Sequence, residues 1–224
     1  MIEWTPIWLS LKLAFLTTVI LLIIAVPLAL WLSHKRNIIK DILEAVVSIP
    51  LVLPPTVLGF YLLQAFSPHN QFGAWLEEYA HIRLVFSFEG LLLASVLYSM
   101  PFMVQPIKSG FRSIPTNLKE AAYSLGKSKW QTLFKVLLPN IKHAILSAVG
   151  LTFAHTLGEF GVVLMIGGNI PESTRTASIA IYDEVEAFHF ENANNYAMIL
   201  LAISFLLLIL LYRSNKSQSN NNFY

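Results

Sequence analysis

The sequence has no cysteine and few charged residues. Among its 224 residues, Asp, Glu, Lys and Arg together make up 12%. Without cysteine the chain forms no disulfide bond and no thiolate metal site. The six histidines show no metal-ligand spacing, so we predict no metal site at all. A soluble domain carries roughly twice this charged fraction, which argues against a soluble chain.

Hydrophobic residues, in contrast, make up 55% of the chain and lie in runs separated by short charged stretches. A helix needs roughly 20 mostly apolar residues to cross the hydrocarbon of a bilayer. We therefore predict an all-α polytopic transmembrane helix bundle, in one domain over residues 1–213, with a disordered polar tail at 214–224. The five predicted spans are residues 7–33, 45–66, 88–107, 141–166 and 196–212.

The basic residues follow the first, third and fifth spans. The loops after the second and fourth spans hold only Arg83 and Arg175. Because Lys and Arg favour cytoplasmic loops, the amino terminus is predicted outside and the carboxyl terminus in the cytoplasm. The basic residues on the predicted cytoplasmic side are Lys35, Arg36, Lys40, Lys108, Arg112, Lys119, Lys127, Lys129, Lys135, Lys142, Arg213 and Lys216.

The loop at 108–140 has the pattern of two short helices joined by a turn. Asn117 and Glu120 are spaced as a capping box, and Ser128 with Gln131 repeats that spacing. Gly126 between them suits the left-handed residue that ends a helix. A basic, partly apolar hairpin of this kind fits docking onto a partner protein and fits lying on anionic lipid equally well.

The same loop resembles the EAA loop of ABC importer permeases. The resemblance rests on the spacing of Glu120-Ala121-Ala122, Gly126 and Leu138-Pro139. It implies a coupling helix that fits into a cleft of an ATP-binding subunit. Ala121 and Ala122 would then allow close approach, while Glu120 would pair with a basic group.

The chain itself is not expected to bind ATP. Gly126-Lys127-Ser128 looks like the end of a phosphate-binding loop, but that motif needs a glycine where Ala121 stands. We therefore expect no cofactor on this chain and no enzymatic activity of its own. Hydrolysis would take place on a separate subunit.

The resemblance covers almost the whole chain and is strongest to permeases for molybdate or tungstate. It is carried by residues 48–59, 156–161, 168–171, 174–176 and 179–182, which look less like the sulfate relatives. One departure is Glu172, where a glycine is expected.

Two stretches are candidates for the pathway or gate. Prolines 54 and 55 interrupt a predicted span, which is tolerated where the backbone lines a cavity or is buried, although a simple packing kink is as good an explanation. Glu159 lies about 25 Å up a predicted helix from Lys142. We expect it to pair with His155 or Arg175 in a structural or gate-closing role, unless it only reaches the headgroups. The full set is Pro54, Pro55, Gly59, Gly158, Glu159, Phe160 and Gly161.

The outer loop supplies three further candidates, Asn169, Pro171 and Arg175. Arg175 could meet the oxyanion, meet a binding protein, or pair with Glu172 or Asp183; pairing is the interpretation we favour. Whether a sixth, partly inserted segment lies around 177–190 is left open.

Five helices do not easily enclose a polar path, so we expect a homodimer around a two-fold axis. The resemblance implies two copies of an ABC ATP-binding subunit, an extracytoplasmic molybdate-binding protein and the cytoplasmic membrane of a prokaryote, with no role for nucleic acid. A permease for another oxyanion, such as sulfate, and a non-transporting membrane scaffold are the alternatives. A secondary transporter would need inverted repeats, and none is visible.

Overall fold

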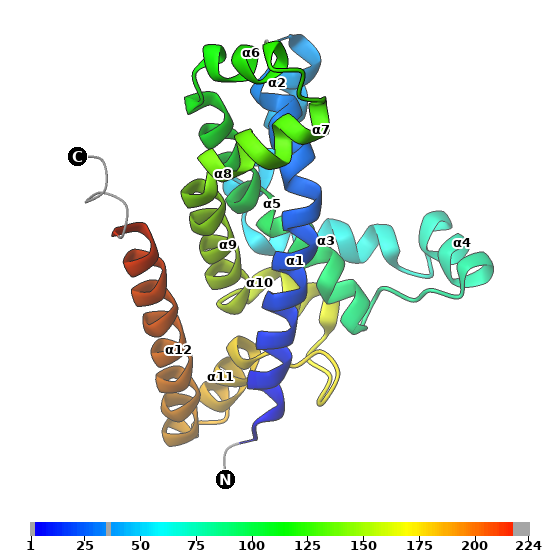
Figure 1. Ribbon diagram of the computed structural model, residues 1–224. Coiled ribbons are helices and arrows are strands. Elements are labelled where there is room, and N and C mark those ends of the chain that lie inside the picture. The colour runs from blue at the N-terminus through cyan, green and yellow to red at the C-terminus, as the bar shows by residue number, and fades with distance from the viewer. Residues whose placement is uncertain (1–2, 35–36, 217–224) are drawn as a thin grey trace.

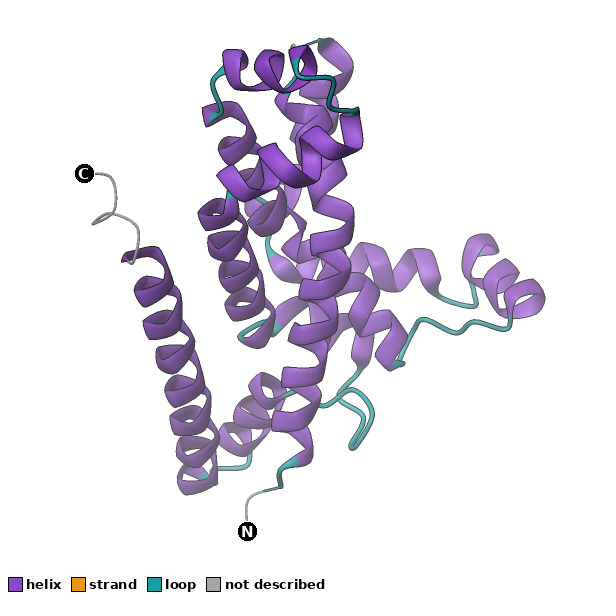
Figure 2. Ribbon diagram, viewed as in Figure 1, coloured by secondary structure: helices purple, strands orange, loops and turns teal. Residues whose placement is uncertain are grey.

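The computed structural model describes residues 3–34 and 37–216, and within them every regular element is a helix (Figure 2). The predicted all-α bundle is therefore confirmed. In order the elements are α1 (Thr5–Ser33), α2 (Ile38–Ser48), η1 (Ile49–Leu51), α3 (Pro55–Phe66), α4 (Gln71–Ala80), α5 (Phe88–Ser113), α6 (Thr116–Ser124), α7 (Lys129–Thr132), η2 (Leu133–Leu137), α8 (Leu138–Asn140), α9 (Lys142–Leu157), α10 (Gly161–Gly167), α11 (Ala177–Glu186) and α12 (Phe190–Lys216).

Within the described residues, three helices are long and apolar enough to cross a membrane, namely α1, α5 and α12. Two bent pairs raise the number to five if each pair is one span. The first pair, residues 38–51 and 55–66, is bent by 109°, and the second, residues 129–140 and 142–157, by 73°. The predicted number of five is thus the upper bound that length and composition allow.

Two of the predicted spans are not continuous helices. The segment predicted at 45–66 begins earlier, with α2, and is broken at residues 52–54. Proline has no N–H and clashes with the preceding turn, so Pro54 and Pro55 end one helix and begin the next. The segment predicted at 141–166 is also broken, because α9 ends at Leu157 and α10 begins only at Gly161.

The centre of the bundle is α5, which packs against both α1 and α9, and these two helices also pack against each other (Figure 1). Alanines 14, 25 and 29 of α1 are completely buried. Such small residues let helix backbones approach closely, which is the main source of helix association inside a membrane. Gly110 of α5 serves the same purpose, since a Cβ there would lie 2.7 Å from the Cβ of Ala144 in α9.

The two ends of the molecule differ. The hairpin α6–α8 lies at the end of α1 opposite the N-terminus, whereas α11 and the start of α12 lie near the N-terminus (Figure 1). With 10 residues, α11 is too short to span, so the segment left open at 177–190 contributes a short helix. α12 continues through Lys216, into the predicted tail. The remainder of that tail, and Lys35 and Arg36, lie outside the described residues.

An ion pair fixes the first half of the broken second segment to the centre of the bundle. The buried ammonium of Lys108 in α5 contacts the Glu44 carboxylate in α2, and Arg112 Nη2 lies 3.8 Å from the second oxygen. About one turn before Lys108 in α5, Gln105 donates a hydrogen bond of 2.8 Å to Ser48 at the end of α2. The position of α2 is therefore set by polar contacts to α5.

Close packing of α5 on α9 predicts the effect of one methyl group. We expect Gly110→Ala to destabilise the chain by about 1–3 kcal/mol, because either Ala144 or the helix must shift. Gly158→Ala is the matched control; its Cβ would meet only the Ala154 carbonyl at 3.7 Å. Thermal unfolding of both variants in the same detergent measures the difference, and equal midpoints would show that the α5–α9 packing is wrong.

Candidate functional site

The hairpin carries a well-formed turn at Gly126. The N–H of Lys127 donates to the carbonyl of Ala122 at 3.1 Å, and the N–H of Gly126 donates to Tyr123 at 2.9 Å. This pair of bonds is a Schellman motif, which satisfies the last carbonyls of α6. Gly126 has a φ of +73°, a left-handed conformation that costs a residue with a side chain about 1–2 kcal/mol.

One of the two predicted capping boxes is present. Ser128 and Gln131 exchange hydrogen bonds of 3.2 and 3.0 Å, and α7 begins there. The prediction for Asn117 is wrong, because α6 begins at Thr116, two residues before the start that a cap at Asn117 would give, and has no side-chain cap. Pro115 occupies the N-cap position, and its fixed φ of −60° sets the start of the helix instead.

The outer surface of the hairpin exposes several large apolar side chains. Of the residues quoted for the EAA pattern, Ala122 is buried, whereas Glu120, Ala121 and Pro139 are exposed. Exposed apolar side chains gathered at one end of a molecule mark a surface that another body covers. They are Tyr123, Leu125, Trp130 and Phe134, with 43%, 79%, 72% and 60% of their surface accessible.

The two helix breaks are brought together by glycines. A Cβ at Gly59 of α3 would lie 2.7 Å from the Cβ of Met165 in α10, and one at Gly161 would lie 2.8 Å from the Cβ of Pro55. Both distances are too short for real side chains, so α3 and α10 pack almost backbone to backbone. The structure thus joins gate candidates that stand about a hundred residues apart in the sequence.

Glu159 lies in the second break and is buried, with 6% of its surface exposed. Neither of its carboxyl oxygens has a hydrogen-bond partner among the described residues, so the predicted pairing with His155 or Arg175 is wrong. Its main chain is held, since the Ser178 hydroxyl in α11 donates to the Glu159 carbonyl. The Phe160 ring lies 5.1 Å from the ring of Tyr182, also in α11.

His155 takes part in a polar contact between α5 and α9 instead. Its Nδ1 lies 3.0 Å from the hydroxyl of Ser99, which also bonds the Thr156 hydroxyl at 2.9 Å. The imidazole stacks on Phe102 with ring centroids 3.9 Å apart. Sequence reasoning missed this group, because isolated Ser and Thr residues in apolar helices carry no spacing signal.

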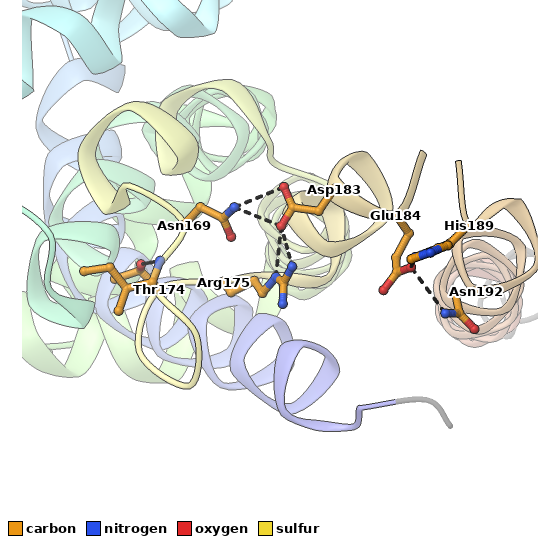
Figure 3. A network of polar contacts seen from close by, with 8 residues as sticks. Asn169, Thr174, Arg175, Asp183, Glu184, His189 and Asn192 are labelled. Carbon is orange, nitrogen blue, oxygen red and sulfur yellow. Dashed lines mark hydrogen bonds and ion pairs between the residues drawn. The ribbon is translucent and has the colours of Figure 1, made fainter. Parts of the chain in front are cut away.

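The outer loop between α10 and α11 is closed by a charged group (Figure 3). Arg175 donates to Asp183 through Nε and Nη2 at 3.0 and 2.6 Å, and Asn169 Nδ2 donates to both oxygens of the same carboxylate. The favoured interpretation of Arg175, pairing with an acidic residue, is confirmed for Asp183. Beneath it, Thr174 donates to the Gly167 carbonyl at 2.7 Å.

The unusual residue of this loop has a backbone explanation. Glu172 has a φ of +62°, in the left-handed region that favours glycine. This is the position at which a glycine is expected from the resemblance. The loop therefore keeps the turn that a glycine would allow, and the backbone of Glu172 is slightly strained there. Pro171 lies one residue before it, in the same exposed turn.

Comparisons with known proteins agree on one family. Residues 22–215 match the family described as "Binding-protein-dependent transport system inner membrane component". The chain is 48% identical over 214 residues to the molybdenum transport system permease protein ModB of Azotobacter vinelandii, covering 96% of this chain and 95% of that one. It is 35% identical over 156 residues to the sulfate transport system permease protein CysT of Escherichia coli (strain K12), covering 70% of this chain and 56% of that one.

The fold has a counterpart among solved structures. A chain from inward-facing conformations of the MetNI methionine ABC transporter superposes with a TM-score of 0.71 at 18% identity, covering 95% of this chain and 94% of that one. The family match, the match to the molybdenum permease and the match to this solved structure each cover most of the sequence, and they are mutually consistent. The chain belongs to the inner membrane component family of binding-protein-dependent transport systems.

Proposed function

We propose that this chain is the membrane-spanning permease subunit of an ABC importer that carries molybdate or tungstate. The observation that supports this most directly is the 48% identity to a molybdenum permease over 96% of the chain, against 35% over 70% for a sulfate permease. The chain is a multi-pass protein of the prokaryotic cytoplasmic membrane in this proposal, and ATP is hydrolysed by a partner subunit.

The hairpin is the proposed contact with the ATP-binding subunit. Its exposed Tyr123 and Leu125 need a cover, and its hydrogen-bonded turn at Gly126 joins α6 to α7. Buried Ala122 keeps α6 close to the bundle, while exposed Glu120 and Ala121 face outward to the partner. Leu138 and Pro139 lie in α8, which connects the hairpin to α9, so that a displacement of the hairpin would also displace α9.

The translocation path is proposed to run along the two breaks, between two copies of the chain. In the first break Val52 is 86% exposed, so this chain alone does not bury the interrupted backbone. Non-helical backbone at membrane depth is tolerated only inside protein or beside water. A second copy around a two-fold axis supplies both conditions. Gly59 and Gly161 would then set how closely α3 and α10 approach in the closed state.

Glu159 is proposed to close the gate through its main chain. Its carboxyl oxygens have no hydrogen-bond partner among the described residues, while its carbonyl accepts a hydrogen bond from Ser178, which ties the second break to α11. Arg175 is committed to Asp183 and is not free to bind the oxyanion. The outer loop with Asn169 and Pro171 would instead receive the extracytoplasmic binding protein, in which most of the selectivity resides.

The competing assignments make different predictions for uptake. We expect cells that carry this chain with its neighbouring transport genes to take up labelled molybdate, and unlabelled tungstate to compete more strongly than sulfate. Cells without the chain are the control. If sulfate competes with labelled molybdate as strongly as tungstate does, the chain is better described as a sulfate permease. If cells without the chain take up as much molybdate as cells with it, the membrane scaffold is the remaining assignment.

The proposed coupling role predicts a backbone effect at Gly126. Nothing lies within 4 Å of a Cβ at this position, so a substitution acts through the positive φ and not through a clash. Gly126→Val strains the turn by about 1–2 kcal/mol or more, and we expect at least a tenfold loss of ATP-driven uptake. Gly126→Asn is the matched control, because Asn adopts left-handed conformations more readily.

Membrane insertion of both Gly126 variants is checked by immunoblot of membrane fractions. Equal uptake by the Val and Asn variants at equal expression would contradict the coupling role.

A further inference from the structure

A groove beside the inner half of α1 has features that no step of transport uses. It has a volume of about 840 Å³ and lies between α1 and the segment α7–η2–α8. Its walls are apolar, with Val26, Leu30, Leu133 and Phe134 among them. On α1 the groove extends from Leu22 to His34, a rise of about 18 Å. One leaflet of the hydrocarbon is about 15 Å thick, so the groove is as long as one acyl chain and its attachment.

A buried ammonium group lies at one end of this groove. Lys40 lines the groove, has 8% of its surface exposed and forms no ion pair within the described residues. Among the described residues, its ammonium lies over the ring of Trp31, 5.0 Å from the ring centroid. A buried charge without a counter-ion destabilises the folded chain. An anionic group seated beside Lys40 would remove that destabilisation.

Two further features point to a headgroup at this end. Lys119 Nζ lies 2.9 Å from His34 Nε2, and the other ring nitrogen of His34 lies 2.6 Å from the Leu30 carbonyl. The imidazole therefore donates to Leu30 and accepts from Lys119, so the Lys119 positive charge lies beside His34, which lines the groove. Trp31 and Trp130 also line the groove, and tryptophan is enriched where hydrocarbon meets headgroups.

We propose that this groove binds an anionic phospholipid of the surrounding bilayer, with one acyl chain along α1 and the phosphate facing Lys40. A soluble partner does not reach the wall of α1, which lies in a membrane-spanning helix. The opposite wall includes η2, a π-helical stretch within the hairpin, and such stretches are frequent at functional sites. The bound lipid would therefore brace the hairpin against α1.

Quenching of tryptophan by brominated lipids tests the proposal. The full-length chain, with Trp4, Trp8 and Trp75 changed to Phe, retains only Trp31 and Trp130 and is reconstituted into phosphatidylcholine vesicles. We expect brominated phosphatidylglycerol to reach half-maximal quenching at an about fivefold lower mole fraction than brominated phosphatidylcholine, as one facing basic residue predicts. Lys40→Gln removes that preference. Lys135→Gln, which removes an exposed charge outside the groove, retains it.

Each other outcome overturns the proposal. If the two lipids quench equally in the chain that keeps Lys40, the groove holds ordinary boundary lipid and has no specific site. Quenching by neither lipid means that protein, such as a second copy of the chain, covers the groove.

Discussion

Every backbone polar group at membrane depth must find a partner, and this requirement governs the whole structure. Two of the apolar segments interrupt their own helices, and with them the helical hydrogen bonds, at residues 52–54 and 158–160. The structure compensates by bringing the two broken segments together, so that α3 and α10 pack through Gly59 and Gly161. The breaks are then neighbours in one unit, which packs on the continuous helix α5.

Two ion pairs lie at the borders of this unit. At one end, Asp183 holds Arg175 and Asn169 and closes the loop after α10. At the other, Glu44 ties α2 to Lys108 of α5. Between them the packing is mostly apolar, with small residues at the closest approaches. The exceptions described above are the contact of Ser99 with His155 and Thr156 and the buried Glu159.

Much of this could be predicted from the sequence. Length and hydropathy indicated the apolar segments, Gly126 and Ser128 with Gln131 indicated the hairpin, and the prolines indicated the first break. The second break was missed, because Gly158 to Gly161 lie inside an apolar run and glycines are common in membrane helices. The cap at Asn117 failed since Pro115 begins α6 earlier. Asp183 was one of the two acidic partners predicted for Arg175. That the Glu159 carboxyl has no hydrogen-bond partner among the described residues was not predicted, because it depends on how α9, α10 and α11 fold back on one another.

Water access at the first break tests the central claim most directly. The chain has no native cysteine, so Val52→Cys gives one thiol in each copy of the chain. Leu201→Cys gives a lipid-facing control on α12, because 64% of the Leu201 surface is exposed. A path along the breaks predicts that a charged, water-soluble thiol reagent modifies Cys at 52 and leaves Cys at 201 untouched, because thiolates form in water and not in hydrocarbon. If both thiols stay unmodified, the first break faces lipid, and the account of the pathway is contradicted.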